Sequence, residues 1–200
     1  MSAAPKRRLT AEEYLVLERQ AAFKSEFYRG EMFAMAGANR NHNRIFHNLS
    51  YLLQHQLKGG TCNLMGPDMR VATASLRNYF YPDLVIVCDK PQYLENSFDT
   101  LLNPQVIFEI LSDSTERFDR GDKFEEYRNI ASLQEYILVS QNKMQIMRFV
   151  RQSEDHWDVR FFKDELGEFI LGTLKVCLSM KNIYEGVEFA PPNQQPESTD

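Results

Sequence analysis

Hydrophobic residues change their spacing along the chain, and this change separates helices from strands. Over residues 42–57 they recur at every third or fourth position, as on one face of a helix. Residues 84–88 and 106–111 are almost continuous apolar runs, which are typical of strands covered on both faces. Over residues 144–163 apolar and polar side chains alternate, as in half-exposed antiparallel strands. The pattern therefore predicts one long helix, buried central strands and added antiparallel strands.

Local signals place the shorter elements between these segments. Thr10 and Glu13 have the spacing of a capping box and predict a helix to about residue 19. Arg29-Gly30, between two apolar runs, predicts a hairpin. Further strands are predicted over residues 61–65, 68–73, 135–140 and 174–178, and further helices over residues 117–128 and 181–184. The sum is an α/β (α+β) fold, with a central mixed β-sheet flanked by helices and added antiparallel strands.

Length and local composition predict how the chain is organised. A chain of 200 residues corresponds to one domain, expected over residues 1–190, and the polar, proline-rich segment 191–200 is expected to be a disordered tail. No apolar run resembles a secretory signal, and none approaches the roughly 18 residues of a membrane span. Cys62, Cys88 and Cys177 are odd in number and far apart, so we predict neither a disulfide framework nor a zinc site. A cytoplasmic protein without a membrane partner is therefore expected.

Composition excludes some classes of protein. Hydrophobic residues make up 43% and charged residues 26% of the chain, which allows a sizeable core and excludes a disordered chain. The formal net charge of −5 excludes a uniformly basic, histone-like protein. It also weighs against nucleic acid as a partner, because binding to phosphates requires a concentrated positive field. Nucleic acid is then expected to bind weakly and with marked salt sensitivity, through local basic residues: Arg70, Arg117, Arg120, Lys123 and Arg128.

Two acidic residues interrupt the apolar strands. Glu109 lies within the run 106–111, where a buried carboxylate is costly unless something compensates its charge. Asp83 follows Pro82 at the start of the run 84–88. If these strands are neighbours, both carboxylates meet at one end of the sheet, where they shift each other's pKa or bind a hard divalent cation. Mg²⁺ or Mn²⁺ there would lower the pKa of a bound water and stabilise charge on a phosphate.

A lysine follows on the next predicted helix. Asp119, Lys123 and Tyr127 are spaced at four and line one helix face, which brings Lys123 near the strand of Glu109. The residues alone leave simpler interpretations open: Asp83 as a turn cap, Glu109 as a structural carboxylate, Lys123 on a solvated helix face, His42 in an N-cap cluster, and Glu26 and Asp68 as surface acids.

Seven motifs follow one another in a characteristic order: FYRGEMFAMAG at 27–37, HN at 42–43, PDMRV at 67–71, YPDLVIV at 81–87, FEILSDST at 108–115, DRGDK at 119–123 and YR at 127–128. Together they resemble the Uma2-like family, also called DUF820, of the PD-(D/E)xK nuclease superfamily. The resemblance covers about residues 10–185. It implies a restriction-endonuclease-like core of a helix, a three-stranded meander, a helix and a further strand. These map onto residues 42–57, strands starting near Asp68, Asp83 and Val106, and then residues 117–128 and 135–140.

The resemblance also implies a metal site. Asp83 and Glu109 take the positions of the two superfamily acids that hold the metal. The carboxylate of Asp68 and the backbone carbonyl of Ile110 are then expected as further ligands.

The chain departs from the superfamily pattern at one position. Leu111, which carries no charge, stands where the motif has lysine, and Lys123 on the next helix is the natural substitute. Substrate contacts are expected from residues that edge the same cleft: Glu26, His42, Arg120 and Tyr127.

We therefore predict a Mg²⁺-dependent (or Mn²⁺-dependent) endonuclease that hydrolyses phosphodiester bonds of DNA, with Asp83, Glu109 and Lys123 as catalytic residues. The alternative is a catalytically inactive nuclease-fold protein that acts as a binding or assembly module, which Leu111 and the acidic net charge favour. The alternating, aromatic-rich strands over residues 144–162 predict a homodimer, although such a stripe is also simply the second face of a sheet.

Overall fold

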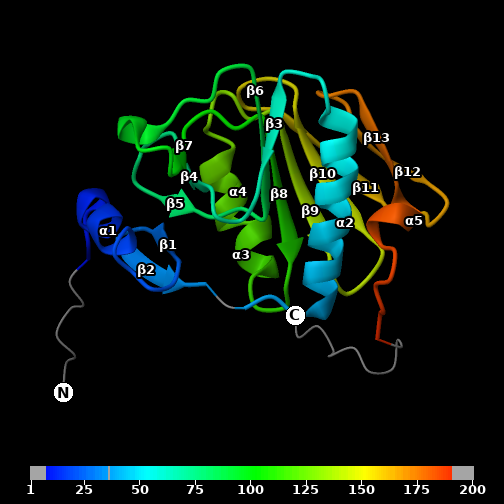
Figure 1. The fold of residues 1–200 in the computed structure, drawn as a ribbon, viewed down its shortest axis with the longest axis horizontal. Coiled ribbons are helices and arrows are strands. Elements are labelled where there is room, and N and C mark those ends of the chain that lie inside the picture. Colours follow the sequence, from blue (N-terminus) through cyan, green and yellow to red (C-terminus); the bar gives the residue numbers. More distant parts are fainter. Residues whose placement is uncertain (1–7, 36, 191–200) are drawn as a thin grey trace.

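The structure is a computed structural model that describes residues 8–35 and 37–190. Its largest sheet has six strands (Figure 1): β3 (Cys62–Met65), β6 (Leu84–Cys88), β8 (Val106–Leu111), β9 (Glu135–Ser140), β10 (Ile146–Arg151) and β11 (Trp157–Phe162). A second sheet has five shorter strands: β1 (Ser25–Tyr28), β2 (Glu31–Ala34), β4 (Arg70–Ala72), β5 (Tyr79–Phe80) and β7 (Thr100–Leu101). A third sheet consists of β12 (Glu168–Leu171) and β13 (Val176–Ser179).

Helices lie between these strands in the chain. They are α1 (Ala11–Glu18), α2 (Arg40–Leu57), the 3-10 turn η1 (Leu94–Asn96), α3 (Glu116–Arg120), α4 (Asp122–Tyr127) and α5 (Met180–Ile183). The predicted mixed α+β class is confirmed. The predicted tail over residues 191–200 lies outside the described residues. No helix in the described part of the chain is long and apolar enough to cross a membrane.

The six-stranded sheet contains a three-stranded meander and a further strand that follows a helical connection. β3, β6 and β8 are an antiparallel meander, and β9 runs parallel to β8. A parallel neighbour requires a crossover connection, which α3 and α4 supply here. Leu84 of β6 lies opposite Phe108 of β8, and this register sets which side chains meet at the end of the sheet.

α2 covers one face of the six-stranded sheet. Its N-cap Asn39 accepts a hydrogen bond from the backbone N–H of His42 at 2.9 Å, so the helix begins two residues before the predicted boundary. Ile45, Leu49 and Leu53 recur at spacing four on its inner face and are completely buried. The predicted helix periodicity is confirmed. β12, β13 and α5 contribute to the same core cluster.

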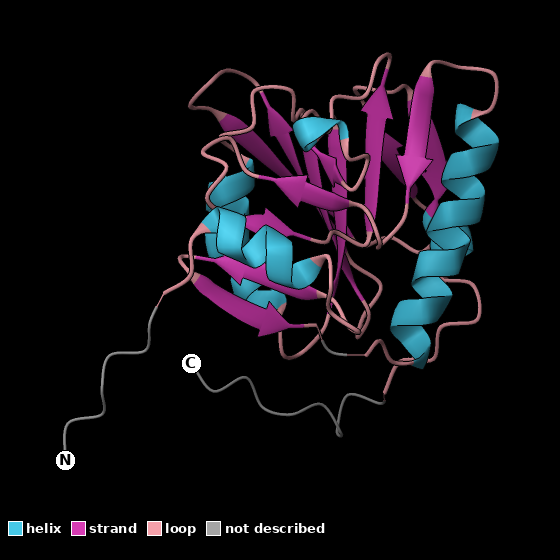
Figure 2. Cartoon of the chain, turned by 60° about the vertical axis from the view of Figure 1, so that its left-hand side comes forward, coloured by secondary structure: helices cyan, strands magenta, loops and turns pink. Residues whose placement is uncertain are grey.

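The opposite face of this sheet packs against α4 and the five-stranded sheet. Ile107 and Tyr136 of the large sheet share a buried cluster with Phe80 of β5 and Tyr127 of α4. α1 packs on the five-stranded sheet through Tyr14, and both come forward in Figure 2. The five-stranded sheet therefore covers the same face of the six-stranded sheet as α4 does.

Two local predictions differ from the structure, and two short strands were not predicted. The strand near Asp68 begins at Arg70 and belongs to the five-stranded sheet, so β3 and not this strand opens the meander. The predicted helix 117–128 is interrupted at Gly121, whose φ of −112° and ψ of −96° are not helical. The two-residue strands β5 and β7 have no sequence signal, because a strand that short shows no periodicity.

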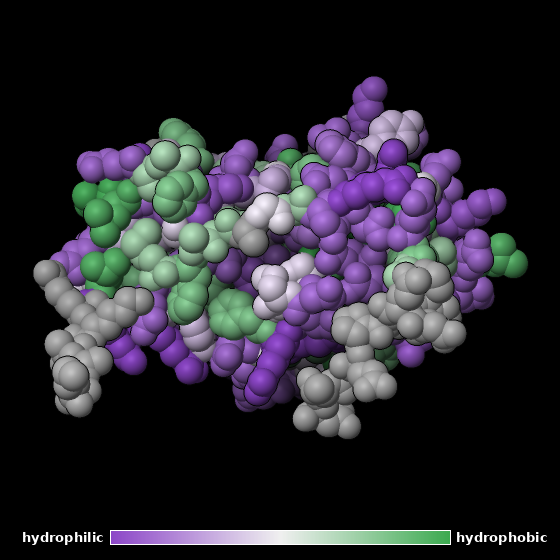
Figure 3. Space-filling model, turned by 90° about the horizontal axis from the view of Figure 1, so that it is seen from below, coloured by the Kyte–Doolittle hydropathy of each residue, from purple (hydrophilic) through white to green (hydrophobic). Residues whose placement is uncertain are grey.

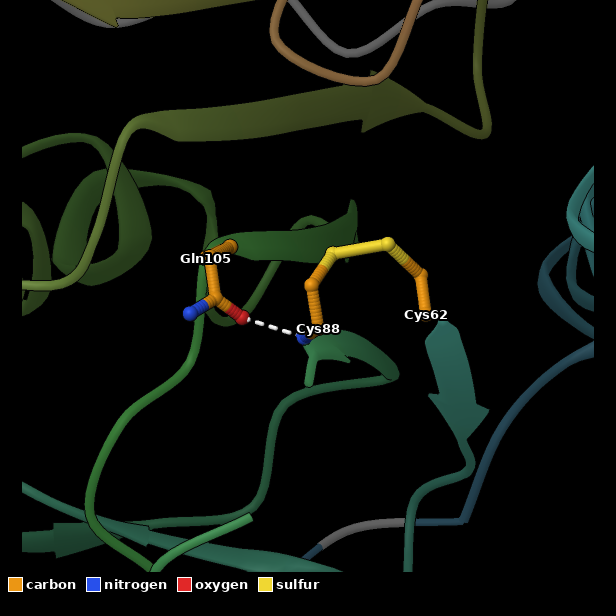
Figure 4. The surroundings of a disulfide bond; sticks show 3 residues. All are labelled: Cys62, Cys88 and Gln105. Atoms are coloured by element: carbon orange, nitrogen blue, oxygen red, sulfur yellow. Dashed lines mark hydrogen bonds between the residues drawn. A yellow bond between two sulfur atoms is a disulfide. The ribbon is translucent and has the colours of Figure 1, made fainter. Parts of the chain in front are cut away.

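The prediction that the cysteines form no disulfide was wrong. Cys62 of β3 and Cys88 of β6 lie directly opposite each other and are joined by a disulfide (Figure 4). Their separation of 26 residues carries no signal in the sequence, because only the pairing of β3 with β6 brings them together. Cys177 is free and exposed. The expectation of a cytoplasmic protein, which drew in part on the absence of a disulfide, therefore loses that support.

Reduction of the Cys62–Cys88 disulfide is expected to lower the free energy of unfolding by about 2–4 kcal/mol, because the cross-link restricts the unfolded chain. Urea unfolding with and without dithiothreitol, in a Cys177→Ser background, measures this change. The same protein with Cys62→Ser and Cys88→Ser is the control and should not respond to the reductant. Identical unfolding curves in both redox states of the Cys177→Ser protein would contradict the assignment.

Candidate active site

A cleft of about 1290 Å³ lies between the β1–β2 hairpin, the start of α2 and the α3–α4 segment. Six of the residues singled out in the sequence line it: Glu26, His42, Asp68, Asp83, Glu109 and Lys123. They come from both large sheets and from two helices. The cleft is therefore formed only when the two sheets pack together.

Asp83 and Glu109 face the same side of the large sheet. The antiparallel register that pairs Leu84 with Phe108 places the preceding residue, Asp83, opposite Glu109. Asp83 Oδ2 accepts a hydrogen bond from the backbone N–H of Ile110 at 2.6 Å, and its Oδ1 lies 3.2 Å from His42 Nε2. Contacts to β8 and to the start of α2 thus hold the Asp83 carboxylate in place. These contacts go beyond the turn cap that the sequence alone left open.

Glu109 is a buried carboxylate. Only 4% of the residue is exposed, and its Oε1 lies 2.9 Å from Lys123 Nζ and accepts a hydrogen bond from the Tyr127 hydroxyl at 3.4 Å. Burial is the main cause that raises the pKa of Glu109 well above its ordinary value, and the negative charges of Asp119 and Asp83 raise it further against the opposing effect of Lys123.

Lys123 is the centre of the cluster and does not lie on a solvated helix face. Its Nζ lies 2.9 Å from Glu26 Oε1, 2.9 Å from Glu109 Oε1 and 3.5 Å from Asp119 Oδ1, and 4% of the residue is exposed. Burial lowers the pKa of Lys123, but the three carboxylates outweigh this effect and raise it well above its ordinary value. The lysine is therefore a permanent cation.

Glu26 connects the hairpin to the strand of Asp83. Its Oε1 contacts Lys123 and also accepts a hydrogen bond from the backbone N–H of Tyr81 at 3.0 Å. The Tyr81 hydroxyl donates to Glu18 of α1 at 3.0 Å, and Arg70 donates to the same hydroxyl at 3.1 Å. No local pattern in the sequence indicates these roles of Glu18 and Tyr81, because both depend on contacts between distant segments.

Three predicted site residues are placed differently. The Asp68 side chain is 91% exposed and pairs with Lys24 at 2.9 Å, and in the described part of the chain no three Asp, Glu, His or Cys side chains gather as metal ligands do. The predicted set of Asp83, Glu109 and Asp68 is therefore not assembled. Arg120 lies outside the cleft lining and pairs with Glu116 at 2.7 Å. Tyr127 is completely buried, so it contacts Glu109 and not a substrate in the cleft.

The donor set fits a divalent cation. The carboxylates of Glu26, Glu109 and Asp119 contact the single ammonium of Lys123, and the Asp83 carboxylate is near enough to Glu109 to raise its pKa. Acidic groups therefore outnumber the lysine in this cluster. Mg²⁺ prefers oxygen ligands and is commonly held by one or two carboxylates together with water and substrate phosphates. Asp83 and Glu109 are such a pair, and a cation beside them would offset the burial and the repulsion that together raise the pKa of Glu109.

Comparisons with known proteins match most of the chain. A family model described as "Uma2: Putative restriction endonuclease" matches residues 11–180. The chain is 38% identical to the Synechocystis "Uncharacterized protein sll1609" over 168 residues. The aligned region covers 84% of this chain and 95% of that protein. It is also 32% identical to the Synechocystis "Uncharacterized protein slr1290" over 186 residues, which cover 93% of this chain and 96% of that protein.

One solved structure shows the same fold. It is the crystal structure of "a putative nuclease belonging to DUF820" from Anabaena variabilis, with a TM-score of 0.73 and 16% sequence identity, covering 88% of this chain and 97% of that one. At this identity the similarity is one of fold.

Proposed function

This chain belongs to the Uma2 family, and we propose that it is a metal-dependent endonuclease that hydrolyses phosphodiester bonds of DNA. The observation that carries the proposal is the placement of Asp83 opposite Glu109, with the Lys123 ammonium 2.9 Å from the Glu109 carboxylate. Two acids and a lysine on adjacent elements are the groups that metal-assisted phosphoryl chemistry requires.

Each residue of the cluster has a proposed role. Asp83 and Glu109 hold Mg²⁺ or Mn²⁺, with the backbone carbonyl of Ile110 as a further ligand. The bound cation would lower the pKa of a water molecule and stabilise negative charge on the phosphate. Lys123 opposes the effect of burial, which raises the pKa of Glu109, and supplies positive charge beside the attacking water or the phosphate. His42 and Tyr127 position the two carboxylates through the contacts described above.

Nicking of supercoiled plasmid by the purified protein tests the proposal. Cleavage is expected with Mg²⁺ or Mn²⁺ and not with EDTA. If the protein neither cleaves nor releases heat on titration with Mn²⁺, the proposal fails and the inactive binding module becomes the better description. Leu111 favours that second candidate, because it stands at the position of the motif lysine and is buried and uncharged.

We also propose that the chain forms a homodimer through the edge of the six-stranded sheet. β11 is an edge strand of the six-stranded sheet, and its Val159 and Phe161 are 47% and 50% exposed. An edge strand offers unpaired backbone groups to a second chain. Light scattering over a range of protein concentrations is expected to give twice the mass of the chain, and a constant monomer mass would contradict the proposal.

A further inference from the structure

One face of the β1–β2 hairpin looks into the cleft. Glu26 and Tyr28 of β1 line the cleft, whereas Phe27 between them packs under α1, as expected when side chains alternate between the faces of a strand. Phe33 of β2 lies directly opposite Glu26. Because directly opposite residues point to the same face, Phe33 shares the face of the carboxylate that contacts Lys123.

This face carries an apolar rim, formed by Phe23, Phe33 and Met35. All three line the cleft, and they are 71%, 49% and 37% exposed, respectively. In Figure 3, hydrophobic side chains gather at the left of the face, where Figure 1 places α1, β1 and β2. Exposed apolar side chains gathered along one cleft make that cleft a candidate binding surface.

The lysines that line the cleft already contact carboxylates of the protein. Among the described lining residues these are Lys24 and Lys123. Lys24 Nζ contacts Asp68 at 2.9 Å and the Pro67 carbonyl at 2.7 Å, and Lys123 contacts three carboxylates. Arg70, predicted to face a phosphate, is 2% exposed and pairs with Asp99 at 3.0 Å. Lys and Arg contacts to phosphates contribute to the binding of duplex and single-stranded DNA alike. With these side chains already paired, the exposed apolar rim is the feature of the lining that would favour one form of DNA over the other.

We propose that the apolar rim stacks against unpaired bases, so that the substrate is single-stranded DNA or an unpaired segment of a duplex. The inference rests on the proposed nuclease function and names its substrate class. Aromatic side chains bind bases of any sequence because every base has a π face. In an intact duplex those faces are covered by the neighbouring bases, whereas an unpaired strand exposes them to Phe23 and Phe33 while its phosphodiester lies near Asp83 and Glu109.

Binding of labelled oligonucleotides tests the inference. Fluorescence anisotropy compares a 5′-labelled oligo(dT) with a duplex of the same length, in Ca²⁺ to limit cleavage. The single strand is expected to bind more tightly. Phe23→Ala and Phe33→Ala are each expected to raise its Kd by at least about 5-fold, the effect of one lost base–aromatic stack. Phe33→Trp, which keeps a stacking ring, should restore binding.

A matched control separates stacking from general loss of exposed apolar surface. Phe98 is 70% exposed, close to the exposure of Phe23, and does not line the cleft, so Phe98→Ala should leave the Kd unchanged. Thermal unfolding of every variant excludes loss of fold. An equal or higher affinity for the duplex, or a Kd unchanged by Phe33→Ala, overturns the inference. Failure of the wild type to bind either oligonucleotide overturns it as well. The inference also fails if Phe33→Ala converts a dimer to a monomer and leaves DNA binding unchanged, because the rim would then be a dimer interface.

Cleavage of the same oligonucleotides with Mg²⁺ or Mn²⁺ separates the inference from the proposed function. Cleavage of the duplex but not of the single strand overturns the inference and supports the nuclease. Binding of the single strand as expected, without cleavage of any substrate, supports the stacking surface and contradicts the nuclease. Cleavage of the single strand that is reduced by Phe33→Ala supports both.

Discussion

Asp83→Asn and Glu109→Gln are each expected to reduce metal-dependent plasmid nicking by at least about 100-fold, because each removes a group proposed to hold the metal against the phosphate. Both substitutions keep the size of the side chain and remove its charge. The effect is expected because Asp83 and Glu109 are opposite each other at the end of adjacent strands and are the carboxylates proposed to share one cation. Initial nicking rates at saturating Mg²⁺ measure the loss.

Two controls make this result specific. Glu125 is an exposed glutamate that pairs with Arg128 and lies outside the cleft lining, so Glu125→Gln should nick at the wild-type rate. Titration with Mn²⁺, followed by calorimetry, should show weaker binding by Asp83→Asn and Glu109→Gln and unchanged binding by Glu125→Gln. Equal nicking by the wild type and both site variants would assign the activity to a contaminant and contradict the proposed function.

Lys123→Met is expected to lower the free energy of unfolding by about 3–5 kcal/mol and to abolish nicking, because it leaves buried carboxylates without their cation. Lys123 is buried and lies within 3.5 Å of Glu26, Glu109 and Asp119. Urea unfolding without added metal measures the loss. Lys181→Met, at an exposed lysine of α5, is the control and should change stability little.

The free energy of unfolding of the Lys123→Met variant is expected to fall as the pH rises. The pKa of Glu109 is already raised above its ordinary value of 4.5, and loss of the ammonium raises it further. The folded state then binds more protons than the unfolded state above about pH 4.5, so its stability falls as pH rises. The destabilisation is therefore expected to be larger at pH 8 than at pH 5. A pH-independent loss would indicate that Lys123 contributes through packing and not through its charge.

The sequence by itself determined the types of the main elements and the two acids. The spacing of Ile45, Leu49 and Leu53 is a local property of a helix, and the continuous apolar runs of β6 and β8 are a local property of covered strands. Asp83 and Glu109 stand out in the sequence because a charge within such a run is costly. The spacing of Asp119, Lys123 and Tyr127 at four likewise predicts that all three lie on one face of the chain after β8.

Only the tertiary structure decided which distant segments meet. It placed β4 in the second sheet, paired Cys62 with Cys88, and buried Lys123 among Glu26, Glu109 and Asp119. It also turned Asp68 and Arg120 towards other partners. Local periodicity indicates whether a side chain is buried or exposed. It does not indicate which residues it contacts, because strand pairing and the packing of the two sheets depend on the chain as a whole. The contact between Glu26 and Lys123, which closes the candidate site, exists only through that packing.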